Sequence, residues 1–66
     1  MQITLNGTAQ QAPDAISLGD LVRQVSDRDR GIAVALNSAV VPRSSWSSTT
    51  VADGDRIDVV TAVQGG

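Results

Sequence analysis

The segment SLGDLVRQV at residues 17–25 has the spacing of a short amphipathic helix. Four apolar side chains stand at positions i, i+3, i+4 and i+7 and therefore share one face. They are Leu18, Leu21, Val22 and Val25. Ser17 precedes them as an N-cap, with Asp20 in the spacing of a capping box. The polar run at residues 26–30 and then Gly31 are the expected end of the helix. Burial of the four side chains is expected to contribute about 1.5–3 kcal/mol each.

Two strands are expected before the helix. In residues 1–6 apolar and polar side chains alternate, which is typical of a half-buried strand. Asn6 and Gly7 follow as a strong hairpin signal, because both residues tolerate positive φ. Residues 8–12 then form a returning strand, and their lack of β-branched side chains suits the edge of a sheet.

Three strands are expected after the helix. Residues 32–36 alternate between large aliphatic side chains and alanine, and a turn at residues 37–38 leads to a very short strand at residues 40–41. Residues 44–50 are polar except for Trp46, which indicates a turn or a short helical piece. After a turn at residues 53–55, the last strand occupies residues 56–63.

This order of elements predicts an α+β domain with a mixed sheet of about five strands and one main helix on one face. If the first and last strands are central and parallel, the arrangement is the β-grasp of the ubiquitin fold. Residues 1–63 then form the folded domain. Residues 64–66 form an extended C-terminal tail, which we expect to be flexible because two glycines lose much entropy when fixed.

Length and composition restrict the class of protein. The chain has 66 residues, 41% of them hydrophobic, and 17 are Val, Ile or Leu, which is too apolar for a disordered protein. No apolar run approaches the ~20 residues of a membrane span, and no leader opens the chain. We therefore expect a cytoplasmic protein with no membrane partner. A net charge of −2 without a basic cluster argues against a nucleic-acid partner.

The residue types that are missing argue against an enzyme. The chain has no Cys and no His, so it lacks a thiolate zinc site, a cysteine nucleophile and the commonest general base. A domain of this size also has little room for a deep pocket. The aspartate pairs Asp27/Asp29 and Asp53/Asp55 lack an evident third ligand, and we expect no metal site.

The closing Gly65-Gly66 is the feature that points to chemistry. An enzyme that adenylates a C-terminal carboxylate must draw the last residues through a narrow channel, and glycine fits any backbone path. The alternative is a frayed end, although a given pair is Gly-Gly in only about 0.5% of cases. Because no cysteine can hold a persulfide, the carboxylate of Gly66 is the one sensible attachment point if the protein carries sulfur.

Several short motifs occur together along the whole chain. They are Met1-Gln2-Ile3, Ala35-Leu36-Asn37, Val41-Pro42-Arg43 with Trp46, Asp53-Gly54-Asp55 with Ile57, and Gly65-Gly66. Their combination resembles the ThiS family, the sulfur carriers of thiamine biosynthesis. Two departures are mild: Gln64 stands where members often have a small or apolar residue, and Asp58 interrupts a strand that is often more apolar.

The resemblance implies a carrier that binds no cofactor of its own. A ThiF-type adenylyltransferase would activate the carboxylate of Gly66 with ATP and magnesium. A sulfur-donor protein would convert the acyl-adenylate to a thiocarboxylate, and thiazole synthase would accept the sulfur. Gln64 and Gly65 would be the part of the tail that threads into the partner.

Four further residues are candidates for partner contact. Val60 and Ala62 fall on the face of the last strand away from the helix, where they form a docking surface unless a loop covers them or the faces are reversed. Trp46 is either a partner anchor or, as we favour, a cap on the core. Arg43 either pairs with an acidic partner surface or is simply solvated.

Two other functions stay open at this point. In the first, the C-terminal glycine still carries sulfur but delivers it to another acceptor, as in the small subunit of molybdopterin synthase. Those proteins tend to be longer and lack the Val41-Pro42-Arg43 and Trp46 arrangement. The second is a ubiquitin-like binding module in which Gly65-Gly66 is incidental. It predicts that truncation of the two glycines leaves partner binding unchanged.

Overall fold

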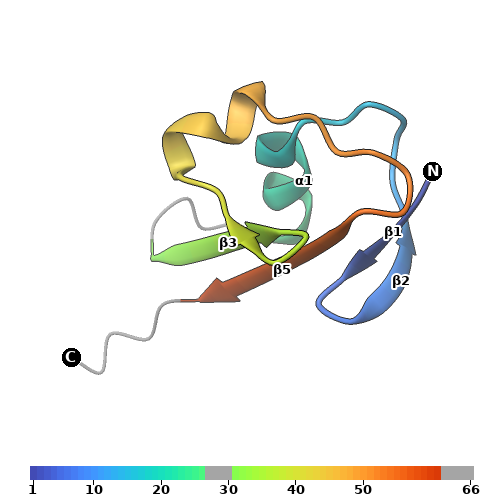
Figure 1. Ribbon diagram of the computed structural model, residues 1–66, viewed down its shortest axis with the longest axis horizontal. Coiled ribbons are helices and arrows are strands. Elements are labelled where there is room, and N and C mark those ends of the chain that lie inside the picture. The colour runs from blue at the N-terminus through green and yellow to red at the C-terminus, as the bar shows by residue number, and fades with distance from the viewer. Residues whose placement is uncertain (27–30, 62–66) are drawn as a thin grey trace.

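The computed structural model describes residues 1–26 and 31–61 (Figure 1). In chain order the elements are β1 (Gln2–Leu5), β2 (Thr8–Gln11), α1 (Leu18–Val25), β3 (Ile32–Leu36), β4 (Ala39–Val40), the 3-10 helix η1 (Arg43–Ser48) and β5 (Arg56–Thr61). The strands form one mixed sheet in the order β2-β1-β5-β3-β4, and both helices lie on the same side of it. The predicted α+β β-grasp arrangement is confirmed, with β1 and β5 as parallel neighbours inside the sheet. No helix in the described part of the chain is long and apolar enough to cross a membrane.

The β1–β2 hairpin has the turn that its sequence predicts. Asn6 and Gly7 have φ angles of +50° and +82°, so both central residues are left-handed, as a type I′ turn requires. The two strands pair antiparallel from Gln2 opposite Gln11 to Leu5 opposite Thr8. All four residues of β2 are exposed, which fits its position at the edge of the sheet.

Asn6 also connects the hairpin to β5. Its backbone N–H donates to the carbonyl of Ile57 at 2.9 Å, and its side-chain Oδ1 accepts from the N–H of Val59 at 2.8 Å. The parallel pairing of β1 with β5 covers Thr4 and Leu5 only, so the Asn6 side chain extends the ladder beyond the end of β1. This contact holds the central strand in register over its second half.

Asn6 contributes to stability through its side-chain hydrogen bond to Val59 and through its left-handed backbone, and two substitutions separate these contributions. In N6A the Val59 N–H loses its acceptor and alanine is placed at a positive φ, so we expect a loss of about 2 kcal/mol in the free energy of unfolding. In N6G the backbone conformation costs nothing, and the expected loss is about 1 kcal/mol. Urea denaturation measures both values. Equal losses in the two variants would contradict the contribution of the left-handed backbone.

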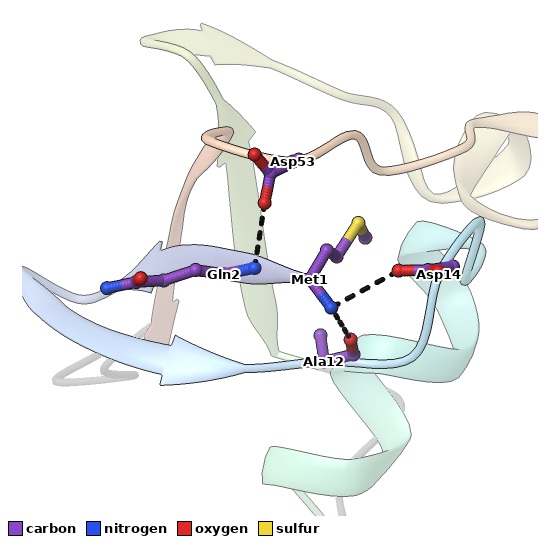
Figure 2. Close-up of polar contacts among 5 residues, drawn as sticks. All are labelled: Met1, Gln2, Ala12, Asp14 and Asp53. Carbon is purple, nitrogen blue, oxygen red and sulfur yellow. Dashed lines mark hydrogen bonds and ion pairs between the residues drawn. The ribbon is translucent and has the colours of Figure 1, made fainter.

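The start of β1 is fixed by the two segments beside it (Figure 2). The amino group of Met1 donates to the carbonyl of Ala12 at 2.8 Å and lies 3.2 Å from an Asp14 carboxylate oxygen. The N–H of Gln2 donates to Oδ1 of Asp53 at 2.9 Å. The segment after β2 and the turn before β5 therefore hold the beginning of β1 from opposite sides.

Helix α1 begins as predicted and ends earlier. Ser17 is the N-cap, and its side chain accepts a hydrogen bond from the N–H of Asp20 at 3.1 Å. Three of the four apolar side chains expected in the core are buried there, while Val25 is 38% exposed. The helix is only two turns long, so Val25 stands at its last position. Ser26 already has an extended backbone, and the helix therefore does not continue toward Gly31.

The core lies between the sheet and the two helices. Its most deeply buried side chains, all at most 1% exposed, are Ile3, Leu18, Leu21, Val34, Val51 and Ile57. They come from β1, α1, β3, β5 and the segment after η1, so every layer contributes to one cluster. Removal of these apolar surfaces from water is the main stabilising term for a domain of this size.

The β3–β4 hairpin differs from the prediction by one residue. Asn37 and Ser38 form a turn with φ angles of +51° and +74°, and Leu36 therefore pairs directly with Ala39. The short strand is Ala39–Val40 rather than residues 40–41. Val41 is half-buried against the core. A two-residue turn leaves no residue between itself and the strand, which accounts for the shift.

Candidate functional site

The last strand, β5, leads toward the closing glycines and positions the candidate site. It pairs with β1 on one side and with β3 on the other, from Ile32 opposite Thr61 to Leu36 opposite Ile57. Ile57 is buried toward α1, whereas Val60 is 59% exposed on the opposite face. The prediction that Ile57 faces the core and Val60 faces away from the helix is confirmed.

The proposed reactive end of the chain falls after the last described residue, Thr61. Ala62, Gln64, Gly65 and Gly66 lie outside the described residues, as does the predicted boundary between residues 63 and 64. The aspartate pair Asp27 and Asp29 also lies outside the described residues.

Val60 belongs to an apolar surface on the face of the sheet away from the helices. Ala33 stands opposite Val60 in the β3–β5 ladder, and Ala35 stands opposite Val40 in the β3–β4 ladder. Val40 is 75% exposed. We call Ala33, Ala35, Val40 and Val60 the open-face patch. Both helices lie on the other side of the sheet, so none of the described elements covers the patch (Figure 1).

Asp58 lies at the border of this patch. It stands opposite Ala35 in the ladder, and its carboxylate is 3.3 Å from Nε of Arg56 on the same strand. Alternation along β5 puts both side chains on the open face. The unusual acidic residue of this strand is therefore paired with a neighbouring cation rather than placed against the core.

Trp46 is a core residue. It is only 7% exposed, and its indole Nε1–H donates to the carbonyl of Val41 at 2.8 Å. This burial agrees with the interpretation of Trp46 as a cap on the core. Arg43 is exposed three residues earlier, at the first position of η1. Both residues lie on the helix side of the sheet, so the four candidate contact residues do not form one surface.

The Asp53-Gly54-Asp55 turn has a structural explanation. Asp55 accepts the N–H of Ala52 at 2.8 Å and the side-chain amide of Asn37 at 3.1 Å. Asn37 in turn accepts the N–H of Arg56 at 3.0 Å through Oδ1. The turn therefore joins the β3–β4 hairpin to the start of β5. No three His, Cys, Asp or Glu side chains gather among residues 1–26 and 31–61 in a way that could hold a metal ion.

This network was missed by reasoning from the sequence. Asn37 is 18 residues from Asp55, and local spacing does not report such a contact. The available signal was the presence of an Asn and an Asp in two separate turns next to strands. Short polar side chains of these types bond backbone groups in turns.

Comparison with known proteins identifies the family. A model described as the ThiS family matches residues 3–66. The chain belongs to the ThiS family. It is 36% identical to the sulfur carrier protein ThiS of Escherichia coli (strain K12) over 66 residues, with 100% of both chains covered. The crystal structure of the thiamine biosynthesis protein ThiS from Geobacter metallireducens matches with a TM-score of 0.88, 26% identity and 100% of both chains covered.

A further relative is a longer protein. The thiazole synthase of Paramagnetospirillum magneticum is 29% identical over 66 residues, which are 100% of this chain and 20% of that protein. As a ThiS family member, the present chain is a sulfur carrier protein of thiamine biosynthesis and not a catalyst. The β-grasp fold of this chain, with β5 in the middle of the sheet, matches the solved ThiS structure over its whole length.

Proposed function

We propose that this ThiS family member carries sulfur as a thiocarboxylate on Gly66 and donates it to the thiazole ring of thiamine. The supporting observation is a family match that extends through residue 66, where the chain ends in Gly65-Gly66. The composition supports the same proposal, because a chain without cysteine has no side chain on which to hold a persulfide.

The proposed chemistry takes place on the partners. A carboxylate oxygen of Gly66 attacks the α-phosphate of ATP on a ThiF-type adenylyltransferase, with magnesium, and pyrophosphate leaves. A nucleophilic sulfur from a donor protein then attacks the acyl carbon, and AMP leaves. When that sulfur is the outer atom of a persulfide, the product is an acyl disulfide. A thiol then attacks the donor's inner sulfur, which breaks the S–S bond, forms a disulfide on the donor and releases the thiocarboxylate. Gly65 has no side chain to obstruct a narrow channel, and Gln64 is the residue that would meet its entrance.

Thiazole synthase is the proposed acceptor. The thiazole synthase of Paramagnetospirillum magneticum contains a segment similar to the whole of this chain. A carrier and its acceptor that occur in one polypeptide are held at a high effective concentration. That arrangement supports a direct transfer of sulfur between the two. A molybdopterin synthase large subunit is the acceptor in the alternative function.

The open-face patch is the proposed docking surface for the protein that holds the tail. It includes one residue of the strand that leads to the tail, Val60, and presents Val60 and Val40 as two strongly exposed aliphatic side chains. Exposed apolar surface of this kind marks interaction sites more often than chance.

Val60→Asp tests the docking surface. A carboxylate in the middle of an apolar contact is expected to weaken binding to the adenylyltransferase about tenfold or more. Stability should fall by only about 1 kcal/mol, because Val60 is exposed and the loss is limited to strand propensity and the nearby charge of Asp58. Isothermal titration calorimetry measures the affinity. The matched control is Gln24→Asp, which adds the same charge to an exposed position of α1 on the other side of the sheet. Equal affinities of V60D and the unmodified chain would contradict docking through the patch.

Reconstitution tests the proposed function. The protein is incubated with ATP, magnesium, the adenylyltransferase and a sulfur source, and its intact mass is measured. The expected result is a mass gain equal to the replacement of one oxygen by sulfur, which disappears when ATP is omitted. Addition of thiazole synthase or of a molybdopterin synthase large subunit then shows which acceptor removes the sulfur. No mass gain under any condition would overturn the proposal.

A further inference from the structure

A groove of about 290 Å³ lies between α1 and η1, on the helix side of the sheet. The buried side chains of Val22 and Trp46 give it an apolar floor. The exposed Arg23 and Arg43 stand at its border. Gly19, Ser44 and Ser47 complete its lining. We call this feature the α1–η1 groove. It takes no part in the chemistry proposed for Gly66.

The hydroxyl groups of η1 and of Thr49, the residue after it, differ in their hydrogen bonds. Ser48 and Thr49 donate their hydroxyls back to the carbonyl of Ser45, at 3.1 and 2.6 Å. Ser44 and Ser47 line the groove, and their hydroxyls form no hydrogen bond within the described part of the chain. Residues three apart in a 3-10 helix are eclipsed, so these two hydroxyls stand on the same side. The groove therefore contains two exposed hydroxyl groups that make no hydrogen bond to the described part of the chain.

The walls of the groove are held in place by contacts made elsewhere. The Trp46 indole is fixed by its hydrogen bond to the carbonyl of Val41. Helix α1 packs against η1 at Gly19, where an added Cβ would lie 3.6 Å from Cβ of Trp46, an ordinary van der Waals distance. A site that is already formed loses little conformational freedom when it binds a ligand.

The charge of the groove selects an acidic occupant. Two of the three arginines in residues 1–26 and 31–61 line it, although the whole chain has a net charge of −2. Arg23 is also 3.2 Å from Asp20, in an exposed pair one helical turn apart. Exposed pairs of this type contribute little, so the guanidinium can exchange Asp20 for a carboxylate in the groove.

We propose that the α1–η1 groove binds an acidic segment of a protein partner. A carboxylate of the segment is bound by Arg23 and Arg43, and Ser44 and Ser47 donate hydrogen bonds to it. The groove and the open-face patch lie on opposite sides of the sheet, so an occupant of the groove leaves the patch accessible. The carrier can therefore be bound by two proteins at the same time.

An NMR titration tests this proposal with a defined probe. The ¹⁵N-labelled full chain is titrated with acetyl-Glu-Leu-Glu-Leu-amide, with the analogue in which Gln replaces Glu, and with inorganic phosphate. We expect saturable shifts at the amides of Gly19, Ser44 and Ser47 and at the Trp46 indole for the acidic peptide. Arg23→Gln and Arg43→Gln should each weaken this binding about fivefold. Added salt should weaken it further.

The matched control is Arg56→Gln, which removes one arginine from the open face and should leave the peptide affinity unchanged. Equal binding of the glutamine analogue would overturn the proposal, as would unchanged affinity in both groove variants. Saturable shifts with phosphate but not with the peptide would also overturn it and identify a site for small anions. Thiocarboxylate formation is measured on the same variants and should persist, so failure of the groove proposal is distinguishable from failure of the proposed function.

Discussion

Deletion of Gly66 is expected to abolish thiocarboxylate formation. The shortened chain still ends in a glycine carboxylate, that of Gly65, so the chemical group itself is retained. Its position changes, because one residue of extended chain spans about 3.5 Å. A misplacement of about 1 Å can cost a factor of about 100 in rate, so a shift of a whole residue should reduce adenylation at least about 1,000-fold. Release of pyrophosphate and the intact mass of the product measure this effect.

Two controls separate the position of the terminal carboxylate from the identity of the last residue. Gly66→Ala keeps the length of the tail and adds one methyl group, so it reports how closely the partner surrounds the last residue. Binding of the shortened chain to the adenylyltransferase should fall much less than the rate, because the open-face patch is unchanged. A shortened chain that still forms the thiocarboxylate at the normal rate, or still supports thiazole formation, would contradict the assignment of sulfur to Gly66.

The elements that local patterns specify could be predicted from the sequence. Alternation along residues 56–61 placed Ile57 in the core and Val60 on the open face, because the side chains of a strand alternate whatever its partners are. The Asn6-Gly7 turn was predictable for a similar reason. Its two left-handed residues are a property of the turn alone.

The errors concern the ends of single elements, whereas the omissions involve relations between segments. Val25 was expected in the core because it continues the helical spacing, but the length of α1 puts it at the end of the helix. The α1–η1 groove combines Arg23 with Arg43, which are 20 residues apart in the chain. Helical spacing in either segment alone does not place these two side chains at one site. Arg43 and Val60, considered together as partner contacts, lie on opposite sides of the sheet.

Trp46→Ala is expected to remove most of the stability of the domain. Truncation of a buried tryptophan typically costs about 3–5 kcal/mol, and a domain of this size is stable by only about 5 kcal/mol. The substitution also leaves the carbonyl of Val41 without the indole donor. Trp46→Phe retains most of the buried ring and loses that donor, so its expected cost is about 1–2 kcal/mol. Urea denaturation followed by far-UV circular dichroism measures both, because the substitutions remove the only tryptophan fluorophore.

The same variants decide between the two roles considered for Trp46. If the indole caps the core, W46A loses stability, while its remaining folded fraction binds the adenylyltransferase as tightly as the unmodified chain does. If the indole anchors a partner, W46A loses affinity and keeps its stability. Val40→Ala, at a position that is 75% exposed, is the control for truncation at the surface and should change stability by less than about 0.5 kcal/mol. The 7% exposure of Trp46 leaves almost no ring surface for a partner to contact, so a large loss of stability with unchanged affinity is the expected result.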